Sequence, residues 1–95
     1  MRILLYGATG TIADSVFKIV KNNKHKFKVV AATCNINYQK LEKLRIKYDI
    51  EKIGINNLKS AEKYKSLNRK INSKHLFVGN KNFSKLITSD IDVII

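Results

Sequence analysis

The feature that most constrains the fold is a regular alternation, along all 95 residues, of short apolar runs with segments of helical periodicity. Short apolar runs that end at turn-forming residues predict buried strands. Apolar residues spaced three or four apart predict helices, as at Ile12, Val16, Ile19 and Val20. The predicted strands span residues 2–6, 27–33, 52–55, 75–78 and 92–95. The predicted helices span residues 11–23, 38–48, 58–71 and 82–88.

The same spacing predicts which helical residues face the core. The first helix is expected to bury the four residues named above. The inward residues expected in the other three helices are Leu41, Leu44 and Tyr48, then Ala61, Tyr64, Leu67 and Ile71, then Phe83, Leu86 and Ile87.

Strict alternation of strand and helix with short loops means parallel strands joined by right-handed helical crossovers. We therefore expect an α/β fold, a Rossmann-like doubly wound parallel sheet of about five strands in three layers, with the chain ending in strand five. Residues 1–95 are expected to form a single, incomplete domain. Such sheets bind ligands beyond the carboxyl ends of their strands. A chain that stops inside a strand is therefore expected to be a fragment or the remnant of a degraded gene.

Composition excludes some classes of function. The chain carries a formal net charge of +12, which suits nucleic acid or an anionic membrane surface. The basic residues are spread over the helices, without an arginine-rich patch or aromatic residues between them, so a nucleic-acid-binding module is the weaker alternative. No apolar run is long enough to cross a membrane, and the first residues do not form a secretory signal. We expect a cytoplasmic protein that makes no membrane contact.

Residues with reactive side chains are few and scattered. Cys34 is the one cysteine, and we expect it to be a small buried apolar residue. His25 and His75 are single residues in lysine-rich turns, expected at the surface. Asp90 and Asp92 form a close carboxylate pair, expected to serve a loop or a cap at the sheet edge opposite the ligand. The sequence therefore predicts no catalytic and no metal-binding residue.

A cluster of small residues separates the first predicted strand from the first helix. Gly7, Gly10 and Ala13 are spaced three apart. In this position a first glycine permits a sharp turn, a second lets the backbone approach a pyrophosphate, and a small third residue lets helix and strand pack closely. The amino end of the helix then offers N–H groups to the phosphates, and the hydroxyl groups of Thr9 and Thr11 add donors. The turn predicts a dinucleotide site.

The end of the second strand bears on the choice of dinucleotide. Sites for NAD place an acidic residue there to bind the ribose hydroxyl groups. This chain has Asn35, Ile36 and Asn37 and no carboxylate. A 2′-phosphate would not be repelled, and Lys40 is near enough in sequence to reach it. This weakly favours NADPH over NADH.

The stretch GATGTIADSVFKIVKNNKHKFKVVAATCNIN resembles the amino-terminal part of the 1-deoxy-D-xylulose 5-phosphate reductoisomerase family. That family opens with a Gly-Ser-Thr-Gly-Ser-Ile-Gly turn and has a Phe-basic-Val-Val-Ala strand ending in Gly-Lys/Arg-Asn. The matching positions in this chain are Gly7 to Ala13, Ser15, Asn23 and Phe27 to Ala31, and more loosely Ala61, Val78-Gly79 and Asp92-Val93. Two departures are Ala13 for the third glycine and Asn35-Ile36 for Gly-Lys/Arg.

The resemblance implies the NADPH-binding part of an oxidoreductase and isomerase of the non-mevalonate isoprenoid pathway. The cofactor-binding residues that it implies are Gly7, Thr9, Gly10, Thr11, Ile12, Asn35, Ile36 and Asn37. It also implies a divalent metal, Mg or Mn, and homodimers in the full-length enzyme. The family's metal and substrate residues lie downstream of this region, so the chain alone is expected to be inactive. An exposed apolar fifth strand is expected to make it self-associate.

One further alternative concerns the family. Atypical short-chain reductases also bind NAD(P) through a turn that can read Gly-Ala-Thr-Gly, the residues found at positions 7–10. The match from Ser15 to Ala31 favours the reductoisomerase family instead.

Overall fold

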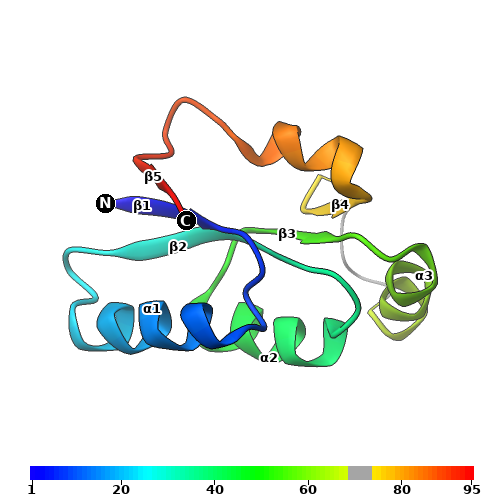
Figure 1. Ribbon diagram of the computed structural model, residues 1–95, viewed down its shortest axis with the longest axis horizontal. Helices are drawn as coiled ribbons and strands as arrows, with labels where there is room; N and C mark the ends of the chain where they lie inside the picture. Colours follow the sequence, from blue (N-terminus) through cyan, green and yellow to red (C-terminus); the bar gives the residue numbers. More distant parts are fainter. Residues whose placement is uncertain (69–73) are drawn as a thin grey trace.

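A computed structural model describes residues 1–68 and 74–95 and contains one five-stranded sheet (Figure 1). All strand pairs are parallel, in the order β4-β3-β2-β1-β5. The strands are β1 (Arg2–Leu5), β2 (Lys28–Cys34), β3 (Lys52–Ile55), β4 (Leu76–Val78) and β5 (Val93–Ile94). The helices are α1 (Thr11–Asn22), α2 (Tyr38–Tyr48), α3 (Leu58–Leu67) and the 3₁₀ helix η1 (Asn80–Leu86). The α/β fold class and the end of the chain at strand five are confirmed.

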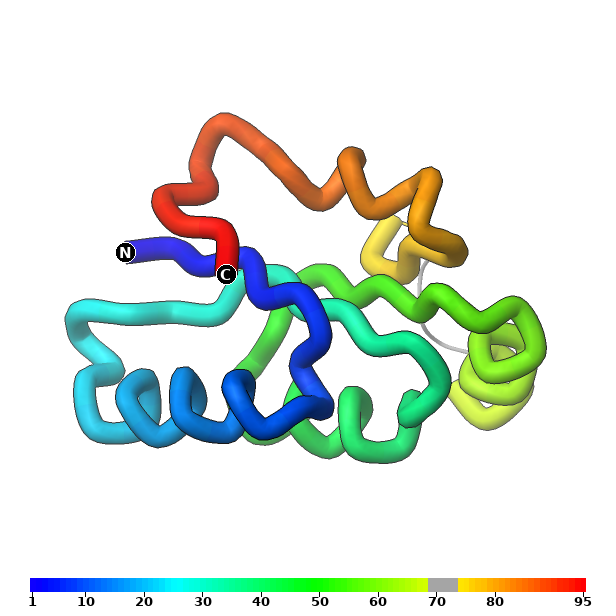
Figure 2. The backbone as a smooth tube through the Cα atoms, in the orientation of Figure 1, coloured from blue at the N-terminus to red at the C-terminus, as the bar shows by residue number. Residues whose placement is uncertain are grey.

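The direction in which the chain crosses the sheet explains its two faces. From β1 to β4 the strands are added one after another in one direction, so right-handed connections put α1, α2 and α3 on the same face. The connection from β4 to β5 runs back past β3, β2 and β1, and it crosses the opposite face. Figure 2 shows this return segment on the far side of the sheet from α1 and α2. The result is the predicted three layers.

The larger part of the core lies between the sheet and the α helices. Ile3 and Leu5 of β1 pack in one cluster with Phe17 of α1 and Leu41 of α2. The rings of Phe17 and Tyr48 lie 4.6 Å apart between their centroids. Burial of this apolar surface is the main stabilising contribution to the fold.

The opposite face is covered by η1 alone among the elements that the structure describes. Leu4, Ala31, Phe83 and Leu86 form its buried cluster. A β-carbon at Gly54 of β3 would lie 2.6 Å from a ring carbon of Phe83. The bare backbone of Gly54 therefore lets the Phe83 ring lie directly on the sheet.

Four expected inward positions are wrong: Ile12, Ile19, Leu67 and, as described below, Ile87. Ile12 and Ile19 of α1 are 75% and 54% exposed, while Ala13 and Phe17 are buried. The small Ala13 lets the helix approach the sheet. The buried row of α1 is therefore Ala13, Phe17 and Val20 rather than the row that contains Ile12 and Ile19. Leu67 of α3 is 70% exposed because the helix ends there.

The last predicted helix also differs from the structure. Residues 80–86 form a 3₁₀ helix rather than an α helix over 82–88. Ile87 is half-exposed, since the backbone has already turned extended at that residue. The predicted helical residues 69–71, including Ile71, lie outside the described residues. No helix in the described part of the chain is long and apolar enough to cross a membrane.

The carboxylates before β5 hold the amino-terminal edge of the sheet. The backbone N–H of Arg2 donates to Asp92 Oδ2 at 2.7 Å, and Arg2 Nε donates to Asp90 Oδ2 at 2.9 Å. Thr88 donates to Asp90, and this bond, together with Arg2, holds the pKa of the Asp90 carboxyl below its usual value. The expected loop role of both residues is therefore confirmed.

The contact between Gly54 and Phe83 yields a stability prediction. Gly54→Ala adds a methyl group against the buried ring, and overpacking of this kind costs about 1–3 kcal/mol. Urea denaturation should show that loss in the free energy of unfolding. The double variant Gly54→Ala/Phe83→Leu should recover part of it, because leucine gives the methyl group room. A Gly54→Ala variant as stable as the wild type would contradict the close packing.

Candidate functional site

The turn after β1 is tied to the end of β2 by two hydrogen bonds. The N–H of Gly7 donates to Thr33 Oγ1 at 3.1 Å, and the N–H of Ala8 donates to the carbonyl oxygen of Thr33 at 2.7 Å. Gly7 has φ +67°, a conformation that glycine adopts without strain. These contacts hold the turn above the carboxyl ends of two neighbouring strands.

The amino end of α1 is open toward this edge. Gly10 occupies the N-cap position in an extended conformation, and no side chain caps the helix. Its N–H donates to the carbonyl oxygen of Gly7 at 3.1 Å, which closes the turn. The first N–H groups of a helix have no partner within the helix, so this end attracts an anion. Thr11 and Ile12 are exposed there and Thr9 is half-buried.

The loop after β2 lies on the neighbouring strand end. Asn37 caps α2, because its Oδ1 accepts from the N–H of Lys40 at 3.1 Å. Ile36 is 60% exposed. Asn35 Oδ1 accepts from Asn56 Nδ2 at 3.2 Å. The structure thus brings the predicted residues of this loop to the same sheet edge as the glycine turn.

Lys40 points back from α2 to the glycine turn. Its Nζ donates to the carbonyl oxygen of Thr9 at 3.2 Å and lies 3.2 Å from Asp14 Oδ1. The cation therefore lies beside the first turn of α1 and neutralises the carboxylate there.

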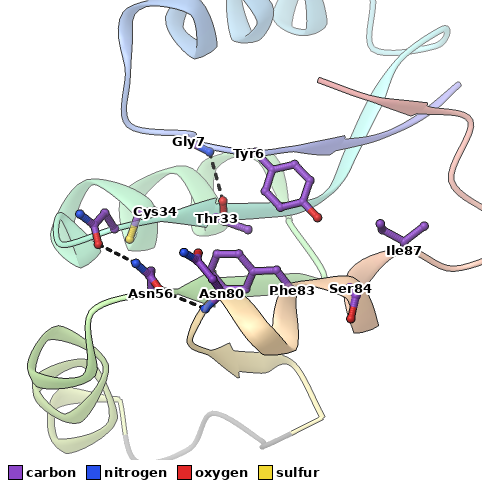
Figure 3. Close-up of a pocket in the computed structure, with 10 residues that line it drawn as sticks. Tyr6, Gly7, Thr33, Cys34, Asn56, Asn80, Phe83, Ser84 and Ile87 are labelled. Carbon is purple, nitrogen blue, oxygen red and sulfur yellow. Dashed lines mark hydrogen bonds between the residues drawn. The ribbon is translucent and has the colours of Figure 1, made fainter.

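The sequence analysis did not predict a row of three hydrogen-bonded asparagines along this edge, which we call the amide ladder. It consists of Asn35 after β2, Asn56 after β3 and Asn80 after β4, and Asn56 links the other two. Its Nδ2 donates to Asn35, and its Oδ1 accepts from the backbone N–H of Asn80 at 2.9 Å; the dashed lines of Figure 3 show these bonds. The available signal was one asparagine after each of three consecutive strands.

A pocket of about 550 Å³ lies between this edge and η1. The rings of Tyr6 and Phe83 line it next to each other, with centroids 6.2 Å apart (Figure 3). Its lining residues are Tyr6, Gly7, Thr33, Cys34, Asn35, Asn56, Asn80, Phe83, Ser84 and Ile87. Cys34 is buried as expected, and burial raises the pKa of its thiol to about 11, so the thiol stays protonated at neutral pH.

The pocket lining combines the polar side chains of Thr33, Asn35, Asn56 and Asn80 with the rings of Tyr6 and Phe83. Among residues 1–68 and 74–95, no group of three or more His, Cys, Asp or Glu could hold a metal ion. His25 is exposed, as expected. His75 is also exposed, and its Nδ1 lies 3.0 Å from the carbonyl oxygen of Glu51, before β4.

The bond between Gly7 and Thr33 can be tested directly. Thr33→Val keeps the shape of the side chain but leaves the partly buried N–H of Gly7 without a partner, which costs about 1–3 kcal/mol. Thr33→Ser keeps the hydroxyl group and serves as the matched control. Chemical denaturation should show the valine variant to be the less stable of the two. Equal stabilities would mean that this bond does not hold the turn.

Comparison with known proteins places this geometry in a family. The family model of 1-deoxy-D-xylulose 5-phosphate reductoisomerase matches residues 3–95. The reductoisomerase of Pelagibacter ubique is 43% identical over 42 residues, which are 44% of this chain and 11% of that protein. The reductoisomerase of Nitratidesulfovibrio vulgaris, strain Hildenborough, is 28% identical over 86 residues, 90% of this chain and 21% of that protein.

Solved structures agree on the fold. The crystal structure of a DOX-P reductoisomerase in complex with magnesium superposes with a TM-score of 0.82 at 20% identity. The match covers 98% of this chain and 24% of that one. This chain therefore spans less than a quarter of the length of each of these relatives. With a family match that extends from the first strand to the last residue, the chain belongs to the 1-deoxy-D-xylulose 5-phosphate reductoisomerase family.

Proposed function

We propose that residues 1–95 are the single amino-terminal domain with which a 1-deoxy-D-xylulose 5-phosphate reductoisomerase binds NADPH. The observation that carries the proposal is the open amino end of α1, held beside the end of β2 by the Gly7–Thr33 hydrogen bond. A dinucleotide needs a phosphate site and a ribose site on adjacent strand ends of a doubly wound sheet.

The phosphate site is fitted by the residues present. A β-carbon at Gly7 would meet no atom within 4 Å, and one at Gly10 only a backbone oxygen at 3.5 Å, so the space above the turn is open to a ligand. We assign the pyrophosphate to Gly7, Thr9, Gly10, Thr11 and Ile12. Backbone N–H groups and two threonine hydroxyl groups supply its donors.

The adenosine end is assigned to the loop after β2, at Asn35, Ile36 and Asn37. These residues directly follow the strand that borders β1, which is where doubly wound sheets bind the adenosine ribose. When bound, NADPH supplies a hydride. The chain's own residues bind the dinucleotide and orient it over the sheet edge.

Catalysis requires more of the enzyme than this domain. The relatives are several times longer, and the described residues contain no cluster of metal ligands. We propose that the part of the full-length relatives downstream of the region matched here supplies the sugar-phosphate site, the divalent-metal site (Mg or Mn) and the homodimer contacts, so that this domain alone is inactive. We place it in the cytoplasm, because a chain with one buried cysteine needs no oxidising compartment.

The phosphate site is tested by Gly10→Val. The backbone of Gly10 is extended, φ −91° and ψ 176°, so valine fits the fold while its side chain enters the phosphate space. We expect calorimetric affinity for NADPH to fall by about tenfold or more, since displaced phosphate contacts are charge-assisted.

The matched control is Ser15→Ala, an exposed position one turn further along α1. It should keep both the affinity and the melting temperature. If folded Gly10→Val binds NADPH as tightly as the wild type does, the pyrophosphate does not bind at this turn.

We also propose that the isolated chain self-associates through β5. This strand pairs only with β1 among the described elements, and Ile94 and Ile95 beside its open edge are nearly half exposed. An apolar edge strand favours pairing between chains.

Sedimentation should show oligomers whose share grows with concentration. Ile94→Lys should reduce that share, because a charge on the edge opposes pairing. Ile46→Lys, at an isoleucine on α2 that is even more exposed than Ile94, should leave it unchanged. A wild-type chain that stays monomeric at high concentration and melts cooperatively would contradict this proposal.

A further inference from the structure

We propose that the Lys40 cation acts at the pyrophosphate end of the dinucleotide site and does not contact the 2′-phosphate. This chain then binds NADPH and NADH with similar affinity. The inference rests on the proposed function and concerns the specificity of the same site.

The first step is the position of the Lys40 cation. Nζ donates to the carbonyl oxygen of Thr9, inside the glycine turn, and pairs with Asp14 in the first turn of α1. Without Lys40, the Asp14 carboxylate would face a bound pyrophosphate and repel it. With Lys40 in place, the first turn of α1 presents no net negative charge to the phosphates.

The second step is the lack of charge at the adenosine end. The loop of Asn35, Ile36 and Asn37 contains no ionisable residue. Two of its polar oxygens already have partners, since Asn37 Oδ1 accepts from Lys40 and Asn35 Oδ1 accepts from Asn56. What this loop offers a ribose is an exposed isoleucine and neutral amide groups.

The consequence follows from what the two cofactors share. Both carry the pyrophosphate, and only NADPH carries the 2′-phosphate. Discrimination between them in doubly wound sheets comes from a carboxylate or a cation at the end of β2. With neither group in the loop, the 2′-phosphate is neither repelled nor paired. Removal of Lys40 should then weaken both cofactors by the same factor.

Within residues 1–68 and 74–95, Lys59 is a second cation to consider, because it lies in the first turn of α3 and the N–H of Asn57, which precedes that helix, donates to the carbonyl oxygen of Asn35 at 3.0 Å. Its side chain is exposed. Lys59→Met removes the same charge as Lys40→Met from a neighbouring helix start, so it is the matched control.

The experiment is calorimetric titration of NADPH and NADH into the folded wild type and five variants, each checked by its melting curve. We expect wild-type dissociation constants within about threefold of each other, and Lys40→Met to weaken both by about five- to tenfold, because it leaves the Asp14 carboxylate without its cation in the first turn of α1. Lys40→Arg should keep both affinities. Ile36→Arg, which adds a cation at the ribose, should strengthen NADPH alone, and Lys59→Met should change neither.

A wild type that prefers NADPH by about tenfold or more, with the preference lost in Lys40→Met or Lys59→Met, would overturn the inference and identify that lysine as the 2′-phosphate contact. Failure of folded wild type to bind either cofactor would overturn the proposed function itself. Asp14→Asn combined with Lys40→Met should regain part of the affinity for both cofactors. If it regains none, charge neutralisation is not the role of Lys40.

Discussion

The candidate site depends on two hydrogen bonds, which the N–H groups of Gly7 and Ala8 donate to Thr33. These bonds join the turn after β1 to the carboxyl end of β2. They hold the glycine turn, and with it the amino end of α1, beside the end of β2. Because Thr33 is buried, water does not compete with Gly7 for the hydrogen bond to its hydroxyl group. Contacts within the sheet therefore hold the turn in place at the ends of β1 and β2.

The handedness of the connections then determines what surrounds that edge. Successive right-handed crossovers place three helices on one face, and the reversal after β4 brings η1 over the other. Gly54 lets the Phe83 ring lie against the sheet, and Phe83 and Tyr6 become walls of the pocket. A packing requirement in β3 therefore contributes to the shape of a cavity that opens above β1 and β2.

Much of this could be predicted from local patterns, because strand runs, helical spacing and a glycine turn are each encoded in neighbouring residues. The faces of the helices were predicted less well. Ile12 and Ile19 fit the apolar period as well as Phe17 does, and only close packing at Ala13 decides between them. The amide ladder could not be predicted from the sequence, since its three asparagines meet only when β2, β3 and β4 lie in that order. The contact between Lys40 and Thr9 could not be predicted for the same reason, because it forms only when α2 packs beside the glycine turn.

The most direct test of the account is to map where NADPH binds by the amide chemical shifts of the isotope-labelled chain. The account predicts that the largest changes fall on the glycine turn, from Gly7 to Ala13, and on the loop from Asn35 to Asn37, two segments joined by Thr33. Changes confined to the lysine-bearing outer surfaces of α1 and α2 would instead show attraction between a chain of net charge +12 and an anion. That result would contradict a dinucleotide site at the strand ends.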